Sequence, residues 1–354
     1  MENKIEKTRN VGIEMLRLIL MFMICILHIL CKGGVLKSCI NGSLEYNIFG
    51  LLEIIAYCAV DCFAIISGYT ANNKPRKYEK IVNIWFQVFF YSFILTLLFH
   101  IVGVNEKLKF MDVIKYALPI TFNKFWYMTA YFALFFSIPI LNKFIFDVDK
   151  KTAKKTFIVI FALFSIIGIL NDPFNTGYGY SALWLIVLYC LGALAKRIKL
   201  FEDKSTTSLI LIWAICVIVT WITYAILDIG RLINYVSPTI LLSSIIIVIL
   251  FSRAKLKGNV VSKLSPLALG IYLFQLNDVV YYDFIANNFT FIATKNIFVG
   301  LLLIFVFASL IFAVGLFVEY IRRSIFKLLK IDIVCKKIVK LADKLLENAI
   351  LMLK

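Results

Sequence analysis

Two residues of the first long apolar run, Arg17 and His28, have side chains suited to group transfer. A neutral histidine can take a proton from a hydroxyl and return it, or carry an acyl group itself. An α-helix turns by about 100° and rises about 1.5 Å per residue, so this spacing places both side chains on one face, about 16 Å apart. Glu14 lies one turn before Arg17 and can pair with its guanidinium. The alternative is a polar pair that only packs this helix in a bundle.

The apolar run that carries these residues covers 11–31, and about 20 apolar residues suffice to cross a bilayer. It is too long for a cleaved signal peptide. A charged side chain that faces lipid is costly. The polar stripe is therefore expected to face protein or a water-accessible cavity.

The composition excludes a soluble globular protein. Hydrophobic residues make up 62% of the 354 and charged residues 17%, with a mean hydropathy of +0.90. We expect an all-α polytopic membrane helix bundle of about ten transmembrane helices, plus a C-terminal amphipathic helix. The predicted spans are 12–31, 48–70, 81–103, 125–142, 156–171, 181–195, 208–227, 236–252, 266–286 and 297–320. Segment 108–122 is expected to be interfacial or re-entrant, because Lys115 and Pro119 interrupt it.

The basic residues predict the orientation. With a cytoplasmic N-terminus, 29 Lys and Arg lie in the inner segments and 8 in the outer loops. Both termini are therefore expected in the cytoplasm of a cell whose plasma membrane holds the chain. This distribution, in short clusters between apolar runs, also argues against nucleic acid as a partner for the net charge of +17. The lysine- and isoleucine-rich composition suggests a bacterium of low GC content.

Two regions are expected: a membrane domain over 1–322 and a basic cytoplasmic tail over 323–354. The tail predicts an amphipathic helix that lies on anionic membrane lipids or, alternatively, binds a partner helix. Its apolar face would hold Val334, Ile338, Leu341, Leu345 and Leu346.

Neither a metal site nor a bound cofactor is expected. The eight cysteines are scattered without a CxxC pair, and most lie inside apolar runs, so they are interpreted as small buried hydrophobic residues. Only two histidines are present, too few for a histidine-rich metal centre.

Several polar residues at membrane depth are candidates to line the cavity. Glu53 lies at a depth similar to that of His28 and could orient its imidazole, whereas Asp61 lies deeper in the same span. Each carboxylate could instead pair with a basic group elsewhere. Gln275 and Asn277, with Asp278, put three polar groups into the ninth span, which favours a cavity over a lipid-facing surface.

Two further groups could bind substrates. Arg76, Lys77 and Lys80 follow the second span and could hold donor phosphates, or serve only as a cytoplasmic anchor. Trp126 and Tyr127 open the fourth span. They fit an interfacial aromatic belt, or a platform on which a sugar ring stacks.

The motifs together resemble the acyltransferase-3 family over about residues 9–322. These motifs are Arg-X10-His in the first span, VDCFAIISGY ending the second, a WY opening before PILN in the fourth, and SPLALGIYLF in the ninth. The resemblance implies a ten-helix membrane enzyme that O-acetylates cell-surface glycans and uses acetyl-CoA as donor. It also implies that Arg17 and His28 are essential.

The sequence departs from the family's pattern at two places. The basic group after the second span lacks the frequent Arg-x-x-Arg form, and Gln275 stands where a histidine is frequent. The expected reaction moves an acetyl group to a sugar hydroxyl of a capsular polysaccharide, exopolysaccharide or other glycan or lipid-linked acceptor. Catalysis would rest on His28 and Arg17, with Glu14 fixing Arg17. A transporter or flippase of lipid-linked sugars is the alternative from another class.

Overall fold

The computed structural model describes residues 10–104, 109–225, 227 and 230–352, and these form helices and connecting loops without a strand. Within the described residues, seven helical segments are long and apolar enough to cross a membrane. They are Val11–Ser38, Leu44–Tyr69, Glu79–Ile101, Trp126–Asp147, Lys150–Asn171, Thr206–Ala225 and Ile297–Leu328. The predicted polytopic helical membrane protein is confirmed.

Short breaks divide several of these segments. The first contains α1 (Val11–Leu27), a π-helical turn (His28–Lys32) and α2 (Val35–Ser38); the second contains α3 (Leu44–Tyr57) and α4 (Ala59–Tyr69). The third contains α5 (Glu79–Phe89), a π-helical turn (Phe90–Ile94) and α6 (Leu95–Ile101); the fifth contains α9 (Lys150–Phe161), a π-helical turn (Ala162–Ile167) and α10 (Gly168–Asn171).

The other helices complete the bundle. They are α7 (Phe110–Ala117), α8 (Trp126–Asp147), α11 (Ala182–Arg197), α12 (Thr206–Ala225), α13 (Pro238–Arg253), α14 (Asn259–Leu264), α15 (Ala268–Gln275), α16 (Ile297–Leu328) and α17 (Ile331–Met352). The short 3-10 turns are Gly177–Gly179, Gly230–Leu232, Ser265–Leu267 and Thr290–Thr294, and a further π-helical turn covers Val280–Ile285. Every predicted span thus coincides with a helical segment, although the ninth is broken after α15.

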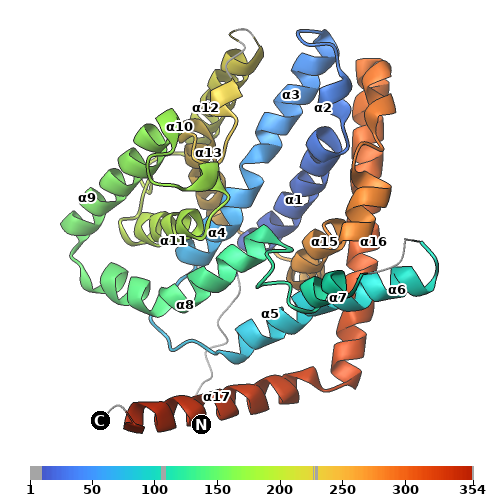
Figure 1. The fold of residues 1–354 in the computed structure, drawn as a ribbon. Coiled ribbons are helices and arrows are strands. Elements are labelled where there is room, and N and C mark those ends of the chain that lie inside the picture. Colours follow the sequence, from blue (N-terminus) through green and yellow to red (C-terminus); the bar gives the residue numbers. More distant parts are fainter. Residues whose placement is uncertain (1–9, 105–108, 226, 228–229, 353–354) are drawn as a thin grey trace.

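Helix α1 lies inside the bundle, between α3 and α16 (Figure 1). It also packs against α4, α13, α14 and α15. Leu16, Leu20 and Cys25 on its packed sides are fully buried. The helix that carries Arg17 and His28 is therefore surrounded by protein on most sides.

The closest packing joins α4 to α11. A Cβ at Gly68 would lie 1.9 Å from the carbonyl oxygen of Tyr189, and one at Gly192 would lie 2.2 Å from that of Ile65. Small residues let membrane helices approach until their backbones touch. The glycine of the ISGY motif is thus required by packing.

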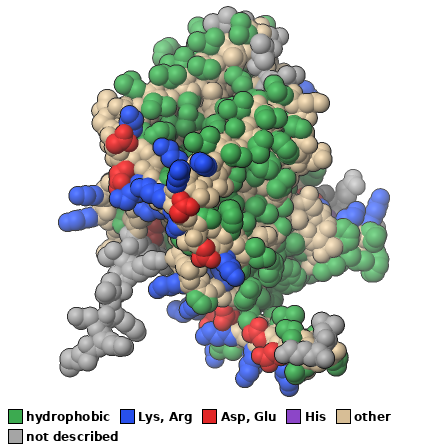
Figure 2. Space-filling model, turned by 90° about the vertical axis from the view of Figure 1, so that its left-hand side faces the viewer, with side chains coloured by type: hydrophobic (Ala, Val, Ile, Leu, Met, Phe, Trp, Pro, Cys, Tyr) green, Lys and Arg blue, Asp and Glu red, His purple; other side chains and the backbone are tan. Residues whose placement is uncertain are grey.

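Helix α17 lies across the foot of the bundle and packs on α5 (Figure 1). Its predicted apolar face is left uncovered, since Leu341, Leu345 and Leu346 are about 60% exposed. Figure 2 shows a hydrophobic upper surface, with Lys and Arg gathered lower and along the bottom. The predicted boundary at 322 and 323 falls within α16, and the chain instead bends at Leu329 and Lys330.

A buried ion pair ties the lower part of the bundle together. Glu319 and Arg322 of α16 form two hydrogen bonds, of 2.8 and 2.6 Å, and both side chains are buried. Gln87 and Tyr91 donate to the same carboxylate from the segment that contains α5. Arg323 bonds Glu319 as well and donates to the carbonyl of Pro266.

Arg322→Ala is expected to lower the free energy of unfolding by about 3–5 kcal/mol, because it leaves the Glu319 carboxylate buried without its main partner. Denaturant titration of the purified protein in detergent measures the change. The double variant Glu319→Leu with Arg322→Met should recover most of the loss, because it removes both charges. Equal destabilisation by the single and double variants would contradict this account.

Candidate functional site

One cavity of about 740 Å³ runs along α1 and contains both residues singled out from their spacing. Arg17 lines it near one end, and His28 and Cys31 line it toward the other. Met21 and Ile24 line it between them, at the spacing that keeps side chains on one helical face. The prediction that the guanidinium and the imidazole face a common cavity is confirmed, while their catalytic roles stay predictions.

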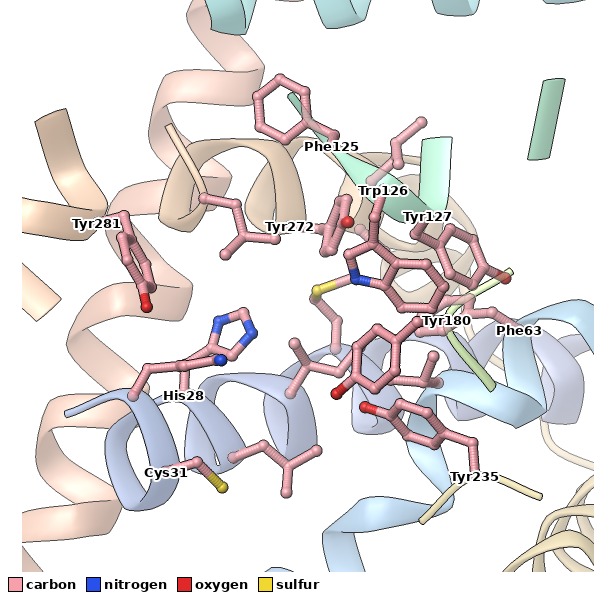
Figure 3. Close-up of a pocket in the computed structure, with 18 of the residues that line it drawn as sticks. His28, Cys31, Phe63, Phe125, Trp126, Tyr127, Tyr180, Tyr235, Tyr272 and Tyr281 are labelled. Atoms are coloured by element: carbon pink, nitrogen blue, oxygen red, sulfur yellow. The ribbon is translucent and has the colours of Figure 1, made fainter. Parts of the chain in front are cut away.

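His28 projects into this cavity (Figure 3). It begins a π-helical turn, a local irregularity that often occurs at functional sites in helices. Its Nδ1 lies 3.0 Å from Oε1 of Gln275. An amide oxygen can only accept, so Nδ1 carries the proton and Nε2 keeps a free lone pair. A hydroxyl that binds in the cavity can give its proton to that nitrogen.

The imidazole is hydrogen-bonded to Gln275 and not to Glu53, which the sequence offered as one group that could orient it. The Glu53 carboxylate accepts a hydrogen bond of 2.9 Å from the Cys31 thiol, and both residues line the cavity. Cys31 is exposed, so its interpretation as a buried hydrophobic residue is wrong. The sequence could not show whether Gln275 or Glu53 bonds His28. Both lie at membrane depth, and depth alone does not identify a partner.

Aromatic side chains form the wall opposite His28 (Figure 3). Trp126 and Tyr127 line the cavity, as expected of a sugar platform. The ring of Tyr180 lies 4.7 Å from that of Trp126 and 5.1 Å from that of Tyr235, measured between centroids. Tyr272 also lines this wall and contacts Tyr127. Tyr180, Tyr235 and Tyr272 were not predicted as site residues. Tyr180 and Tyr235 lie in connections between apolar spans, where no periodic pattern singles them out.

Asp172 shapes the loop that presents Tyr180. Its carboxylate accepts hydrogen bonds from the backbone of Thr176, Gly177 and Tyr178 and from the Thr176 hydroxyl. Partial burial raises the pKa of Asp172, but these hydrogen bonds outweigh it and hold the pKa below its ordinary value. The carboxylate therefore stays ionised, and its hydrogen bonds persist, at neutral pH.

Three of the predicted lining residues lie outside the cavity: Gln275, which is fully buried and reaches it only through His28, and also Asp61 and Asn277. Asp61 is fully buried and accepts a 3.0 Å hydrogen bond from the Trp184 indole. Asn277 caps the break after α15: its Oδ1 accepts from the amides of Val279 and Val280, and its Nδ2 donates to Thr96. Asn277 is corrected to a structural role, because its amide groups are already used in holding helices together. Asp61 uses Oδ1 in the same way, whereas its Oδ2 is buried without a hydrogen-bond partner among the described residues.

Asp278 does line the cavity, as the sequence suggested. It forms an ion pair of 2.5 Å with Lys124 and accepts a hydrogen bond from the Tyr116 hydroxyl of α7. Lys124 also lies over the Tyr116 ring, 4.2 Å from its centroid. Burial and the Asp278 carboxylate raise the pKa of Tyr116, so the hydroxyl remains a donor. Helix α7 is thereby fastened to the break in the ninth span.

The predicted donor-binding residues differ from one another in placement. Arg76 is half-buried, with its guanidinium 5.2 Å from the centroid of the Phe135 ring, whereas Lys77 and Lys80 are exposed. Tyr131 lies within electrostatic range of both Arg76 and Arg17. None of the three basic residues lines the cavity.

Glu14 is buried beside the same end of the cavity without lining it. Its carboxylate accepts a hydrogen bond from the Ser262 hydroxyl of α14, which ties α1 to the segment before α15. Ser265 and Pro266 of the following turn line the cavity. Glu14 therefore helps to hold the cavity wall near Arg17.

The comparisons with known proteins give one family. A family model described as an acyltransferase domain, that of the acyltransferase-3 family, matches residues 10–318, nearly the whole chain. No curated protein and no solved structure matches the chain.

Proposed function

The chain belongs to the acyltransferase-3 family and is a multi-pass membrane acyltransferase; from this premise, we propose that it moves an acetyl group from acetyl-CoA to a sugar hydroxyl of a cell-surface glycan. A capsular polysaccharide, an exopolysaccharide or a lipid-linked precursor provides that hydroxyl. The single observation that carries the proposal is the His28 imidazole, oriented by Gln275 in a cavity that also reaches Arg17.

In the proposed reaction, His28 acts as general base and then as general acid. Nε2 takes the proton of the sugar hydroxyl as its oxygen attacks the thioester carbonyl. The tetrahedral intermediate then collapses, the carbon–sulfur bond breaks, and the imidazolium protonates the departing thiolate of coenzyme A. Gln275 supports the transient imidazolium, because its Oε1 accepts the hydrogen bond from Nδ1. Alternatively, His28 itself carries the acetyl group between the two substrates.

Arg17 has the complementary task of holding the donor. Hydrogen bonds need heavy atoms about 3 Å apart, whereas eleven residues of helix rise about 16 Å. Arg17 and His28 are therefore too far apart to contact the same thioester carbonyl group at once. We assign Arg17 and Arg76 to the polar body of acetyl-CoA, whose thioester arm reaches along Met21 and Ile24 toward His28.

The aromatic wall supports the sugar acceptor. Trp126, Tyr180 and Tyr235 present rings on which the apolar face of a sugar can pack, and their polar atoms can meet its hydroxyls. The excess of inner-side Lys and Arg supports a cytosolic donor end and an extracytoplasmic His28 end, with the chain in the plasma membrane.

His28→Ala is expected to reduce acetyl transfer at least about 100-fold, the usual contribution of a general base. Acetate released by mild base from purified surface glycan measures it, at equal abundance of the variant in the membrane. Phe298→Ala, at a side chain 85% exposed outside the cavity, is the matched control. Unchanged O-acetylation in His28→Ala would refute the proposal. A change in glycan amount with unchanged acetyl content per sugar would favour transport.

Gln275→Leu is expected to lower kcat by about 10-fold to 100-fold, because it removes the acceptor for Nδ1–H inside a buried site. The KM for acetyl-CoA should stay near the wild-type value. Gln275→His should restore most of the rate, since an imidazole nitrogen can accept the same hydrogen bond. An equal loss in the leucine and histidine variants would show that Gln275 acts only through packing.

Arg76→Ala is expected to raise the KM for acetyl-CoA by about 10-fold, the loss of one charge-assisted hydrogen bond. Lys77→Ala removes the same charge one residue away, at an exposed position, and should change KM by less than about twofold. Initial rates at varied acetyl-CoA measure both variants. Equal effects would mean that the cluster acts only through its overall charge.

A further inference from the structure

A second hollow of about 400 Å³ adjoins the cavity and has a different lining. Its walls come from the segment after His28, from α3 and from α12. Its polar and aromatic residues are Cys31, Lys37, Cys39, Asn41, Tyr46, Glu53 and Tyr224. The hollow is more open than the cavity, so we call it the outer groove. None of its polar and aromatic residues has a part in the mechanism above.

The outer groove meets the cavity at a defined place. Cys31 and Glu53, joined by their hydrogen bond, line both hollows. Cys31 lies three residues beyond His28, about one helical turn farther along the chain. A ligand that reaches His28 in the cavity can therefore continue past the Glu53 carboxylate into the groove.

The groove contains a preformed aromatic surface. The rings of Tyr46 and Tyr224 are stacked, with centroids 4.9 Å apart and planes inclined by 25°. Gly50 leaves room for the Tyr224 ring, because a Cβ there would lie 2.3 Å from one of its carbons. Trp221 donates a 2.9 Å hydrogen bond to the carbonyl of Asn47 and so joins α12 to α3 beside this pair.

These features match the chemistry of a carbohydrate. Aromatic rings pack on the apolar face of a sugar, while a carboxylate, an amide and an ammonium group can bind its hydroxyls. A protein partner would need a much larger surface than this hollow provides. An acyl chain would not use the polar groups of Lys37, Asn41 and Glu53.

We propose that the outer groove binds the sugar unit next to the one that is acetylated, so that the acceptor is an oligosaccharide or polysaccharide rather than a single sugar. This inference rests on the proposed function. The reacting unit lies beside His28 and the aromatic wall, and the chain leaves past Glu53 and Cys31 over Tyr46 and Tyr224. Specificity for a chain then comes from a surface that the reacting sugar never touches.

The test uses the full-length protein in detergent with radiolabelled acetyl-CoA. The acceptor is the surface polysaccharide of the expressing cells, freed of its O-acetyl groups with mild base and offered intact or hydrolysed to monosaccharides. For the wild type, the KM per sugar should be at least about tenfold lower for the intact chain than for monosaccharides. A tenfold ratio corresponds to the free energy of one good aromatic contact. Equal KM values for chain and monosaccharides would overturn the inference.

Variants of the groove sharpen the test. Tyr46→Ala and Tyr224→Ala should each raise the KM for the intact chain about tenfold and leave the rate with monosaccharides unchanged. Tyr46→Phe and Tyr224→Phe keep the stacked rings and should stay near the wild type, as should Phe298→Ala. Gly50→Ala leaves the Tyr224 side chain in the protein but pushes its ring out of the observed position. It should therefore have the same effect on KM as Tyr224→Ala. Wild-type KM values in both alanine variants at Tyr46 and Tyr224 would refute the groove.

Two kinds of failure stay distinct. If the wild type transfers acetate to the chain and His28→Ala does not, the proposed function holds, and the groove variants alone decide the inference. If the wild type transfers no acetate to any form of the polysaccharide, the proposed function fails, and the inference is refuted with it.

Discussion

An ionisable side chain inside a membrane must be kept away from lipid, and this constraint organises the whole molecule. Arg17 and His28 share one face of α1, so that face needs protein or water along about three helical turns. The bundle meets the requirement by surrounding α1 and leaving a cavity along this one stripe. Elsewhere on α1, apolar side chains such as Leu16, Leu20 and Cys25 are fully buried, which fixes the direction in which the stripe points.

Irregular backbone contributes several parts of the cavity wall beside the regular helices. His28 begins a π-helical turn, the ninth span breaks at Asn277, and Tyr180 follows a loop held by Asp172. Backbone that is not helical is tolerated at membrane depth where protein or water satisfies its polar groups. Here the side chains of Asn277 and Asp172 supply those hydrogen bonds. The same segments that cannot face lipid thereby become the ones that shape the site.

Sequence reasoning succeeded where one helix carries the information and failed where a contact joins distant segments. The spacing of Arg17 and His28 predicted their common face, because helical geometry fixes it. The Gln275 partner of His28 lies 247 residues away, and no periodicity reports such a contact. Asp61 and Asn277 are polar groups at membrane depth for a structural reason, which composition does not distinguish from a functional one. Only part of the aromatic wall was predicted. Trp126 was identified because it opens a span, whereas Tyr180 lies in a loop and was not.

The apolar part of the cavity lining has a consequence for proton permeation. Met21, Ile24, Val60 and Phe63 give the cavity an apolar stretch of wall. An apolar lining disfavours a continuous file of water, and without such a file protons do not hop across the bilayer. In the proposed function, an uncharged thioester arm lies along this stretch, so that donor and acceptor meet without a continuous path for protons.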